Sequence, residues 1–574
     1  MKYYDRLVEK GKLQDEGWES VRVSYALQID ENGDLRRVIP LKQEENRGKK
    51  TVQMPQILCV PARRKRSVKI IPNFLCDNST YMLGKDKKEN PERAAECFKQ
   101  SCEMHIRLLQ NSKGKAARSL RNFFAKWDPE KAEENEILAP YLEEITGGEN
   151  IVFMVGTEYV HEDNECREAW NAFYTDTTNA ERMRCLVTGK TEPIARLHPS
   201  IKGIVGGQSS GTTLVSFNAP AFESYGRDGA QGLNAPVSVR AAFAYSAALK
   251  YMIETPGHHL RLSDQTIVFW AENGEDDYAE LCSAMFGEET GLSLDDLNEL
   301  MKNLASGREV HWKDGMLNPG EKFFILGLSP NAARLSVRYF LQSTIGEFAE
   351  NLSMHHERMR IVRPPKDERA ALSFWQLLNE TVNQKSQDKK PLPLLSGDLV
   401  RSVMLGLPYP DMLFSQVELR IRADHSITRG RAGIIKAVLL KKNEYTGEDK
   451  EKKEALTVEL NEETKYAPYV LGRLFAVLED LQQAANPGIN ATIKDRFFNS
   501  ACATPAVVFP QLIKLSQAHL KKLNPGLAYH YSKKIGEMMG KMEQDYPQRL
   551  NLQDQGIYQL GYYHQKWTRK KEEN

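Results

Sequence analysis

Hydrophobic residues near the N-terminus alternate with polar ones, which is the pattern of β-strands. From Val23 to Ile29 every second residue is large and apolar, and successive side chains of a strand point to opposite faces. The sequence Glu31-Asn32-Gly33-Asp34 follows, and Asn-Gly readily adopts the positive φ angles of a tight hairpin turn. We therefore predict a hairpin whose return strand contains residues 38–41.

The middle of the chain alternates between short apolar runs and amphipathic stretches, which predicts strands mixed with helices. Apolar runs typical of buried strands lie at residues 151–155, 265–270 and 323–328. Helical periodicity covers residues 91–127, and Ser238 is a suitable N-cap for a helix that runs to about residue 254. Residues 185–237 are rich in Gly, Ser, Asn and Pro and predict loops.

From about residue 464 onward the pattern is helical. The apolar residues from Leu471 to Leu481 fall on one stripe, and similar stripes follow. Breaks at 486–488, 524–526 and Pro547 separate four or five such segments. Because the connections are short, an antiparallel bundle is the expected packing.

These patterns predict an α+β fold with a large mixed α/β N-terminal region and a C-terminal antiparallel helical bundle. We predict four segments, of which the first two form one N-terminal unit. They are an α/β part with a basic loop at 1–150, an α/β part with a Gly-rich loop at 151–395, a basic connecting segment at 396–463 and the helical bundle at 464–574.

The composition mainly excludes certain classes of protein. The chain has 574 residues, of which 41% are hydrophobic, enough for a substantial core. Its longest apolar run is about nine residues, whereas a membrane span needs about 18, and no secretory signal begins the sequence. We therefore expect a cytoplasmic protein without membrane contact. The eight cysteines contain no CxxC pair, which favours free thiols over a zinc site.

The net charge of +1 is a cancellation between segregated runs. Residues 271–300 contain ten acidic and no basic residues, whereas residues 420–442 contain seven basic residues and one acidic residue. Further basic runs lie at 63–69 and 113–126. A single charge run is usually a solvated face, but three basic runs in one chain favour a polyanionic ligand.

The most suggestive local motif is the glycine-rich sequence from Gly206 to Thr213. It resembles a phosphate-binding loop, but Thr212 occupies the lysine position, which argues against nucleotide hydrolysis. A Gly-rich loop still exposes backbone amides to a large ligand; a tight turn between strands is the equal alternative.

No catalytic motif is evident. The pairs His258-His259 and His355-His356 have no HExxH spacing, so we predict neither a metal site nor a cofactor. No GxSxG elbow is present. A metal-dependent nuclease or a nucleotide hydrolase remains an alternative function, and an RNA-binding assembly scaffold is another.

Several long segments together resemble one protein family. The most distinctive is GGQSSGTTLVSFNAPAFESYG at residues 206–226. The others lie at residues 72–84, 185–189, 197–199, 234–238, 326–334, 420–424, 469–475 and 555–565. They are similar to the large subunit of the type I-C CRISPR interference complex, Cascade, nearly from end to end.

This resemblance implies a non-catalytic subunit of an RNA-guided complex in antiviral defence. Such a subunit recognises the PAM, a short motif in the double-stranded target DNA, while the guide RNA reads the sequence by base pairing. It also aids strand separation, stabilises the R-loop and helps recruit a helicase-nuclease. The implied partners are the guide RNA (crRNA), the target DNA, that helicase-nuclease and the backbone, handle-binding and small subunits of Cascade. The C-terminal bundle resembles the small subunit.

We expect two groups of residues to contact nucleic acid. The residues predicted to read the PAM are Gly206, Gly207, Gln208, Ser209, Ser210, Gly211 and Asn218, with Asn73, Asn78 and Lys85 as a second choice, because amide and hydroxyl side chains can bond to base edges. The residues predicted to hold backbone phosphates are Arg63, Arg64, Lys65, Arg66, Arg420, Arg422, Arg429, Arg431 and Lys436.

Overall fold

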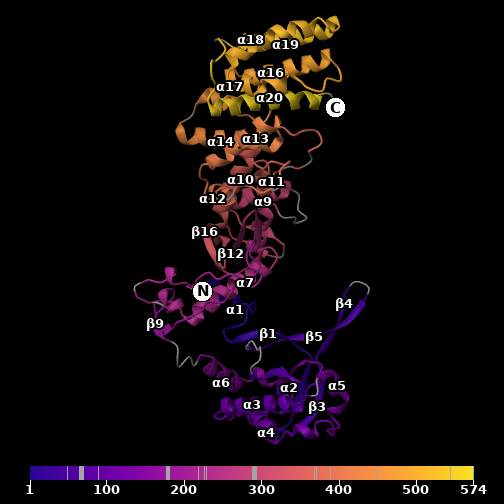
Figure 1. Ribbon diagram of the computed structural model, residues 1–574, viewed down its shortest axis with the longest axis vertical. Helices are drawn as coiled ribbons and strands as arrows, with labels where there is room; N and C mark the ends of the chain where they lie inside the picture. Colours follow the sequence, from indigo (N-terminus) through magenta and orange to yellow (C-terminus); the bar gives the residue numbers. More distant parts are fainter. Residues whose placement is uncertain are drawn as a thin grey trace. The chain divides into compact units, whose positions relative to one another are not determined.

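The structure is a computed structural model, and its described residues form two compact units. It describes residues 1–574 except 48–49, 64–69, 88–89, 176–180, 218, 225, 228, 288–293, 314, 368, 370, 388, 393, 448, 543–544 and 573–574. The first unit contains residues 1, 3–198 and 217–247, and the second contains residues 2, 199–216 and 248–574. The predicted segment 151–395 contributes to both units. The predicted α+β fold is confirmed, since sheets occur in the N-terminal and central parts and helices in the C-terminal part (Figure 1).

The first unit is built on a mixed sheet with the strand order β3-β2-β7-β6, to which β8 is added beside β7. Its elements are α1 (Lys2–Glu9), β1 (Trp18–Val23), β2 (Tyr25–Ile29), β3 (Leu35–Pro40), β4 (Lys42–Arg47), β5 (Lys50–Pro61), β6 (Cys76–Asn78), α2 (Ser79–Met82), α3 (Pro91–Leu109), α4 (Lys115–Lys126), α5 (Leu142–Ile145), β7 (Asn150–Val155), β8 (Glu158–Tyr159), α6 (Asn164–Thr175), β9 (Arg182–Arg184) and β10 (Thr191–Pro193). The helix α7 (Val239–Glu254) has residues in both units.

The predicted N-terminal hairpin is confirmed as the antiparallel pair β2–β3. Gly33 lies in its turn with φ +85°, and a Cβ at this position would meet the backbone of α4 at 2.3 Å. The turn therefore needs glycine both for its backbone angle and for the close approach of the helix. Phe123 of α4 and Phe153 of β7 lie in the hydrophobic core of this unit.

The second unit begins with an antiparallel sheet in the strand order β11-β12-β15-β16. Its strands are β11 (His259–Leu262), β12 (Gln265–Ala271), β15 (Lys322–Asn331) and β16 (Arg334–Thr344), and a separate small pair is β13 (Val310–Trp312) with β14 (Gly315–Leu317). Phe269, Ile325 and Leu341 are opposite one another on adjacent strands and belong to the core. One face of the sheet is thus buried, and residues at alternate positions lie on the other face.

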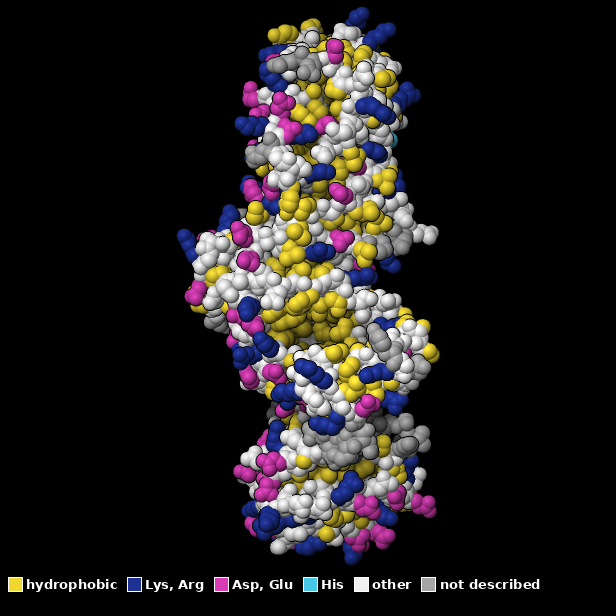
Figure 2. Space-filling model, turned by 90° about the vertical axis from the view of Figure 1, so that its left-hand side faces the viewer, with side chains coloured by type: hydrophobic (Ala, Val, Ile, Leu, Met, Phe, Trp, Pro, Cys, Tyr) yellow, Lys and Arg dark blue, Asp and Glu magenta, His cyan; other side chains and the backbone are white. Residues whose placement is uncertain are grey.

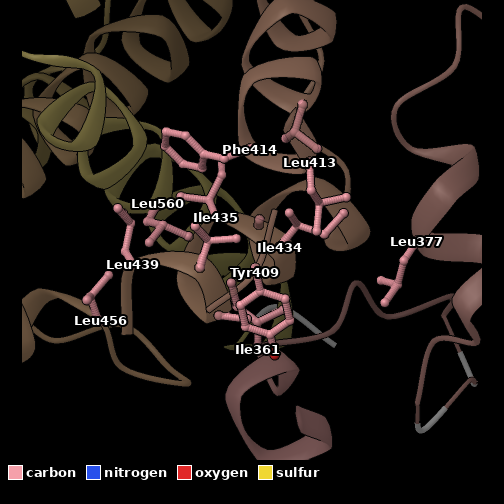
Figure 3. Close-up of a cluster of buried hydrophobic side chains, with 14 of the residues drawn as sticks. Ile361, Leu377, Tyr409, Leu413, Phe414, Ile434, Ile435, Leu439, Leu456 and Leu560 are labelled. Atoms are coloured by element: carbon pink, nitrogen blue, oxygen red, sulfur yellow. The ribbon is translucent and has the colours of Figure 1, made fainter. Parts of the chain in front are cut away.

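Helices complete the second unit. They are α8 (Asp276–Met285), α9 (Leu294–Ala305), α10 (Ile345–Met359), α11 (Phe374–Asn379), α12 (Leu395–Met404), α13 (Asp411–Asp424), α14 (Arg429–Thr446), α15 (Lys450–Ala455), α16 (Ala467–Ala485), α17 (Ile493–Ala503), α18 (Pro505–Leu520), α19 (Pro525–Lys541) and α20 (Leu552–Glu572). One continuous hydrophobic cluster extends from the sheet to α20. Figure 3 shows Phe414 of α13 and Ile435 of α14 beside Leu560 of α20.

The C-terminal helices form the predicted bundle, in which successive helices alternate in direction. Phe475 of α16 contacts Phe498 of α17. Glu479, one turn after Phe475, accepts a hydrogen bond from Thr492, which precedes Phe498 by six residues. These two helices are therefore antiparallel. The first and fifth helices are parallel, because Tyr466 bonds to Asp554 at one end and Lys566 to Asp480 at the other.

Two glycines allow α16 and α20 to cross at very short range. A Cβ on Gly472 would lie 1.9 Å from the carbonyl oxygen of Tyr558. Reciprocally, a Cβ on Gly561 would lie 2.1 Å from the carbonyl oxygen of Tyr469. Because both obstacles are backbone atoms, neither can be relieved by a change of rotamer.

The contact of α13 with α20 contains a buried carboxylate. Glu418 is 2% exposed, and one of its oxygens accepts a hydrogen bond from Gln559 at 2.9 Å. Arg422 lies 3.8 Å from the same oxygen. Burial raises the pKa of Glu418 to about 7 because it disfavours the charged form.

None of the described helices combines the length and the apolar character needed to cross a membrane.

We predict that Gly561→Ala destabilises the second unit by about 3 kcal/mol, because α20 must move away from α16 to admit the methyl group. Differential scanning calorimetry measures the effect. Gly536→Ala on α19 is the matched control, since a Cβ there meets nothing within 4 Å; it should raise stability slightly through helix propensity. Equal effects of the two substitutions would contradict the close crossing.

We also predict that Glu418→Gln stabilises the protein at pH 8 but not at pH 4.5. Folding raises the pKa of Glu418 from 4.5 to about 7. The free energy of unfolding of the native protein therefore falls as the pH rises through this window. The free energy of unfolding of the variant should exceed that of the native protein by about 3 kcal/mol at pH 8. Urea denaturation across this range tests it, with exposed Glu350→Gln on α10 as control. A pH-independent difference would reject this titration.

Candidate nucleic-acid interface

The Gly-rich loop, residues 206–211, is closed by paired backbone segments. Ile201 and Thr212 form an antiparallel bridge at its base. Within it, the N–H of Gly207 donates to Ile204 at 3.0 Å and the N–H of Gly211 donates to Gln208 at 2.9 Å. Gly206 and Gly211 have φ angles of +71° and +98°, which glycine adopts without strain. The loop is therefore two consecutive tight turns.

The second unit's sheet anchors this loop. The N–H of Val205 donates to the hydroxyl of Thr266 on β12 at 3.0 Å. After the loop, Thr213 bonds to the backbone of Ala333 and Leu335, at 3.1 and 2.9 Å, at the turn between β15 and β16. The loop thus has rigid supports on both sides.

The tip of the loop faces solvent. The side chains of Gln208, Ser209 and Ser210 are exposed. Within the described part of the chain, their backbone N–H groups have no hydrogen-bond acceptor. Three adjacent backbone donors beside amide and hydroxyl side chains are suited to phosphate oxygens and to base edges. Asn218, the remaining predicted reader near this loop, lies outside the described residues.

Three exposed cations that sequence runs did not reveal belong to the same region. Lys202 precedes the loop, Arg261 lies on β11 opposite Thr266, and Arg338 is the extra residue of a bulge in β16. Among the described residues, none of the three has an ion-pair partner. They were missed because each is isolated in the sequence. Strand pairing places Arg261 and Arg338 in one sheet, and Lys202 follows the bridge of Ile201 with Thr212 at the base of the loop.

The second-choice residues have structural roles in the first unit. Asn73 is 7% exposed, and its N–H donates to Asp77 at 2.9 Å. The N–H of Asn78 donates to the same carboxylate at 2.8 Å. Lys85 pairs with Glu133 at 2.9 Å. Because Asn73 is buried and Lys85 is neutralised, these residues are poorly placed to contact DNA.

The first basic run is only partly described. Arg63 forms an ion pair with Glu19 at 2.8 Å. Arg64, Lys65 and Arg66 lie outside the described residues, so their predicted contact with nucleic-acid backbone stays a prediction.

The basic run of residues 420–436 turns largely inward. Arg431 is 4% exposed, and it pairs with Asp424 at 2.7 Å and with Glu380 at 3.4 Å. Arg420 pairs with Asp424 as well. The run that carries a surplus of positive charge in the sequence is thus neutralised by carboxylates that fold against it.

Two further members of this run are also buried. Arg429 is 7% exposed and pairs with Asp367 at 3.3 Å. Lys436 is 2% exposed and donates to the carbonyl of Arg358 at 2.9 Å, and burial lowers its pKa to about 8. The expected phosphate contacts of Arg429, Arg431 and Lys436 therefore conflict with their burial, since a buried cation cannot reach a phosphate. Arg422 is about half exposed and bonds to Gln555.

A cavity of about 1180 Å³ lies beside Arg429, but its lining does not select a charged ligand. Arg360 and Arg363 face it together with Glu299 and Glu357. Charges of both signs around one cavity favour neither anions nor cations.

Comparison with known families decides the identity. The profile of the CRISPR-associated protein family Cas_Csd1 matches residues 1–569. The chain belongs to the Csd1 family. Csd1 proteins are the large subunits of type I-C Cascade, so the family resemblance of the sequence is confirmed. No curated protein matches the chain.

Membership in Csd1 makes this chain a subunit of a CRISPR interference complex. Other Cascade proteins and crRNA are the partners implied by that family. Among the described residues, no group of three or more His, Cys, Asp or Glu side chains is placed to hold a metal ion.

We predict that Arg431→Ala in this Csd1 chain costs about 1–3 kcal/mol of stability, because the partly buried carboxylates of Asp424 and Glu380 each lose one hydrogen-bonding partner. The salt dependence of DNA binding by the assembled complex should stay unchanged. Calorimetry and affinities across a salt series measure the two effects. Arg401→Ala, at an exposed arginine of α12, is the control. A shallower salt slope with unchanged stability would instead identify Arg431 as a phosphate contact.

Proposed function

We propose that this Csd1 chain is the subunit of Cascade that recognises the PAM of double-stranded target DNA. The observation that carries the proposal is the exposed tip of the Gly-rich loop, where Gln208, Ser209 and Ser210 present side chains and bare backbone N–H groups. Its anchors on the sheet hold these groups in place, and a preorganised reader loses little entropy on binding. The glycines let a DNA backbone approach closely.

Lys202, Arg261 and Arg338 are the proposed phosphate contacts beside this loop. They are exposed and lack ion-pair partners among the described residues. Contacts with phosphates position a protein on the duplex without reading its sequence, whereas base edges supply the selectivity. The burial of Arg429, Arg431 and Lys436 thus moves the proposed phosphate contacts from a basic run to dispersed cations.

The wider role proposed for the chain follows from the family. Guide RNA pairing reads the target sequence, so the protein needs only to read a short flanking motif, aid strand separation and stabilise the R-loop. We propose that the chain performs these steps without catalysis in the cytoplasm, and that it helps recruit the helicase-nuclease that cuts the target.

We predict that Gln208→Ala combined with Ser209→Ala lowers affinity for PAM-bearing duplex about 10-fold, because one good base contact is worth about 1–3 kcal/mol. Affinity for duplex without the PAM should change less than about twofold, since phosphate contacts remain. Guide-loaded Cascade is assembled with each variant, and a library with randomised flanks first identifies the PAM. Electrophoretic mobility shift then measures both affinities.

The control for this test is Gln384→Ala combined with Ser306→Ala, at two exposed positions of the same unit. It should bind both duplexes as the native chain does. Equal loss on PAM-bearing and PAM-less duplexes would reject the reading role of the loop. A complex that discriminates PAMs without this chain would reject the proposed function altogether.

A further inference from the structure

The outer face of the sheet β11-β12-β15-β16 carries an aromatic cluster. Trp270 of β12 is directly opposite Phe324 of β15, and Phe340 of β16 lies one step along the same face, opposite Leu326. These residues alternate with Phe269, Ile325 and Leu341, which are in the core. Their side chains therefore point away from the core.

The three rings form a compact set with similar orientations. The ring centroids of Trp270 and Phe324 are 5.3 Å apart with planes at 19°, and those of Phe324 and Phe340 are 6.0 Å apart with planes at 15°. Trp270 and Phe340 are 6.3 Å apart. Phe340 lies on an edge strand and is 54% exposed. Near-parallel rings with one open member can take up a further planar ring.

One end of this outer face is covered by another part of the chain, and the other end is exposed. Val268 and Leu328 lie on the same face but are fully buried. The chain of residues 199–216 lies over that end, as the bonds from Val205 to Thr266 and from Thr213 to Leu335 show. Towards Phe340 the face is open. Figure 2 shows hydrophobic side chains gathered at the height that this sheet has in Figure 1.

Arg338 brings positive charge to the open end of this face. Val337, 51% exposed, and the bulged Arg338 extend the surface next to Phe340. Gln342, opposite Phe324, adds an exposed amide. The carboxylate of Glu272, just past the end of β12, lies 3.7 Å from Lys322.

We propose that this aromatic face binds single-stranded DNA, with bases stacked against Phe340, Phe324 and Trp270 and phosphates held by Arg338. Aromatic rings flanked by cations are how proteins bind single strands without sequence preference, and exposed rings on a four-stranded sheet are one known form of such a platform. The inference rests on the proposed function: the Gly-rich loop lies on the same face of the sheet, so a strand released from duplex DNA at the loop begins beside the rings.

Two substitutions of Phe340 distinguish base stacking from simple apolar contact. Phe340→Leu keeps an apolar side chain but removes the ring, and it should weaken binding of a fluorescent 20-nucleotide oligo(dT) about 10-fold. Phe340→Tyr keeps the ring and should bind within about twofold of the native chain. Val337→Ala removes exposed apolar surface on the same strand and is the matched control, with unchanged affinity expected. Fluorescence anisotropy of the full chain measures all four.

A crosslinking readout tests contact directly. An oligonucleotide containing 5-iododeoxyuridine is irradiated with the full chain, and mass spectrometry maps the crosslinked peptides. We expect crosslinks in the peptides that contain Phe340 or Trp270. Oligo(U) in place of oligo(dT) tests RNA as the ligand, and tighter binding of oligo(U) would overturn the assignment to DNA.

The outcomes distinguish this inference from the proposed function. If Phe340→Leu leaves oligo(dT) binding unchanged while the loop variant still loses PAM discrimination, the platform alone is wrong. If Phe340→Leu instead prevents assembly into Cascade without changing oligo(dT) binding, the face is a protein contact, which also overturns the proposal. Loss of oligo(dT) binding by Phe340→Leu, with a loop variant that discriminates PAMs normally, would retain the platform and reject the reading loop.

Discussion

The alternation of side chains across the sheet β11-β12-β15-β16 is the constraint on which the candidate interface depends. Because Phe269, Ile325 and Leu341 must be buried against the helices, the register of the strands directs their neighbours to the outer face. That face supports the Gly-rich loop through Thr266 and exposes the aromatic rings beyond it. A shift of one residue in the register would exchange the two faces, and core, loop support and rings would be lost together.

The candidate interface differs from the rest of the second unit in having exposed cations without ion-pair partners among the described residues. The densest run of cations in the sequence lies at residues 420–436. Most of these cations are neutralised inside the fold, as Arg431 is by Asp424. Removing such charges from water is costly, so the buried cations pair with carboxylates or, in the case of Lys436, bond to a backbone carbonyl. Isolated cations such as Arg261 and Arg338 are exposed and remain available to a polyanion. Local charge density along a chain therefore does not measure the charge that a ligand meets.

The helical C-terminal part is continuous with the remainder of the second unit rather than an appended bundle. One hydrophobic cluster extends from the sheet to α20, and the close approach of Gly472 to Tyr558 and of Gly561 to Tyr469 brings the first and last helices of the bundle together. Parallel packing of these two helices follows from an odd number of alternating helices. A movement of α20 would thus change contacts both in the bundle and at α13, where Gln559 donates a hydrogen bond to Glu418.

Local patterns in the sequence were sufficient to predict the α+β class, the β2–β3 hairpin, the alternating helical bundle and the family, because these depend on periodicity, turn residues and motif identity. The glycines at 206 and 211 likewise indicate a tight loop from the sequence alone. Only the tertiary structure decided which charges are exposed, since burial of Lys436 depends on helices distant in sequence. It also decided that Trp270, Phe324 and Phe340 meet, because strand pairing between residues far apart in the chain creates that neighbourhood and no local pattern records it.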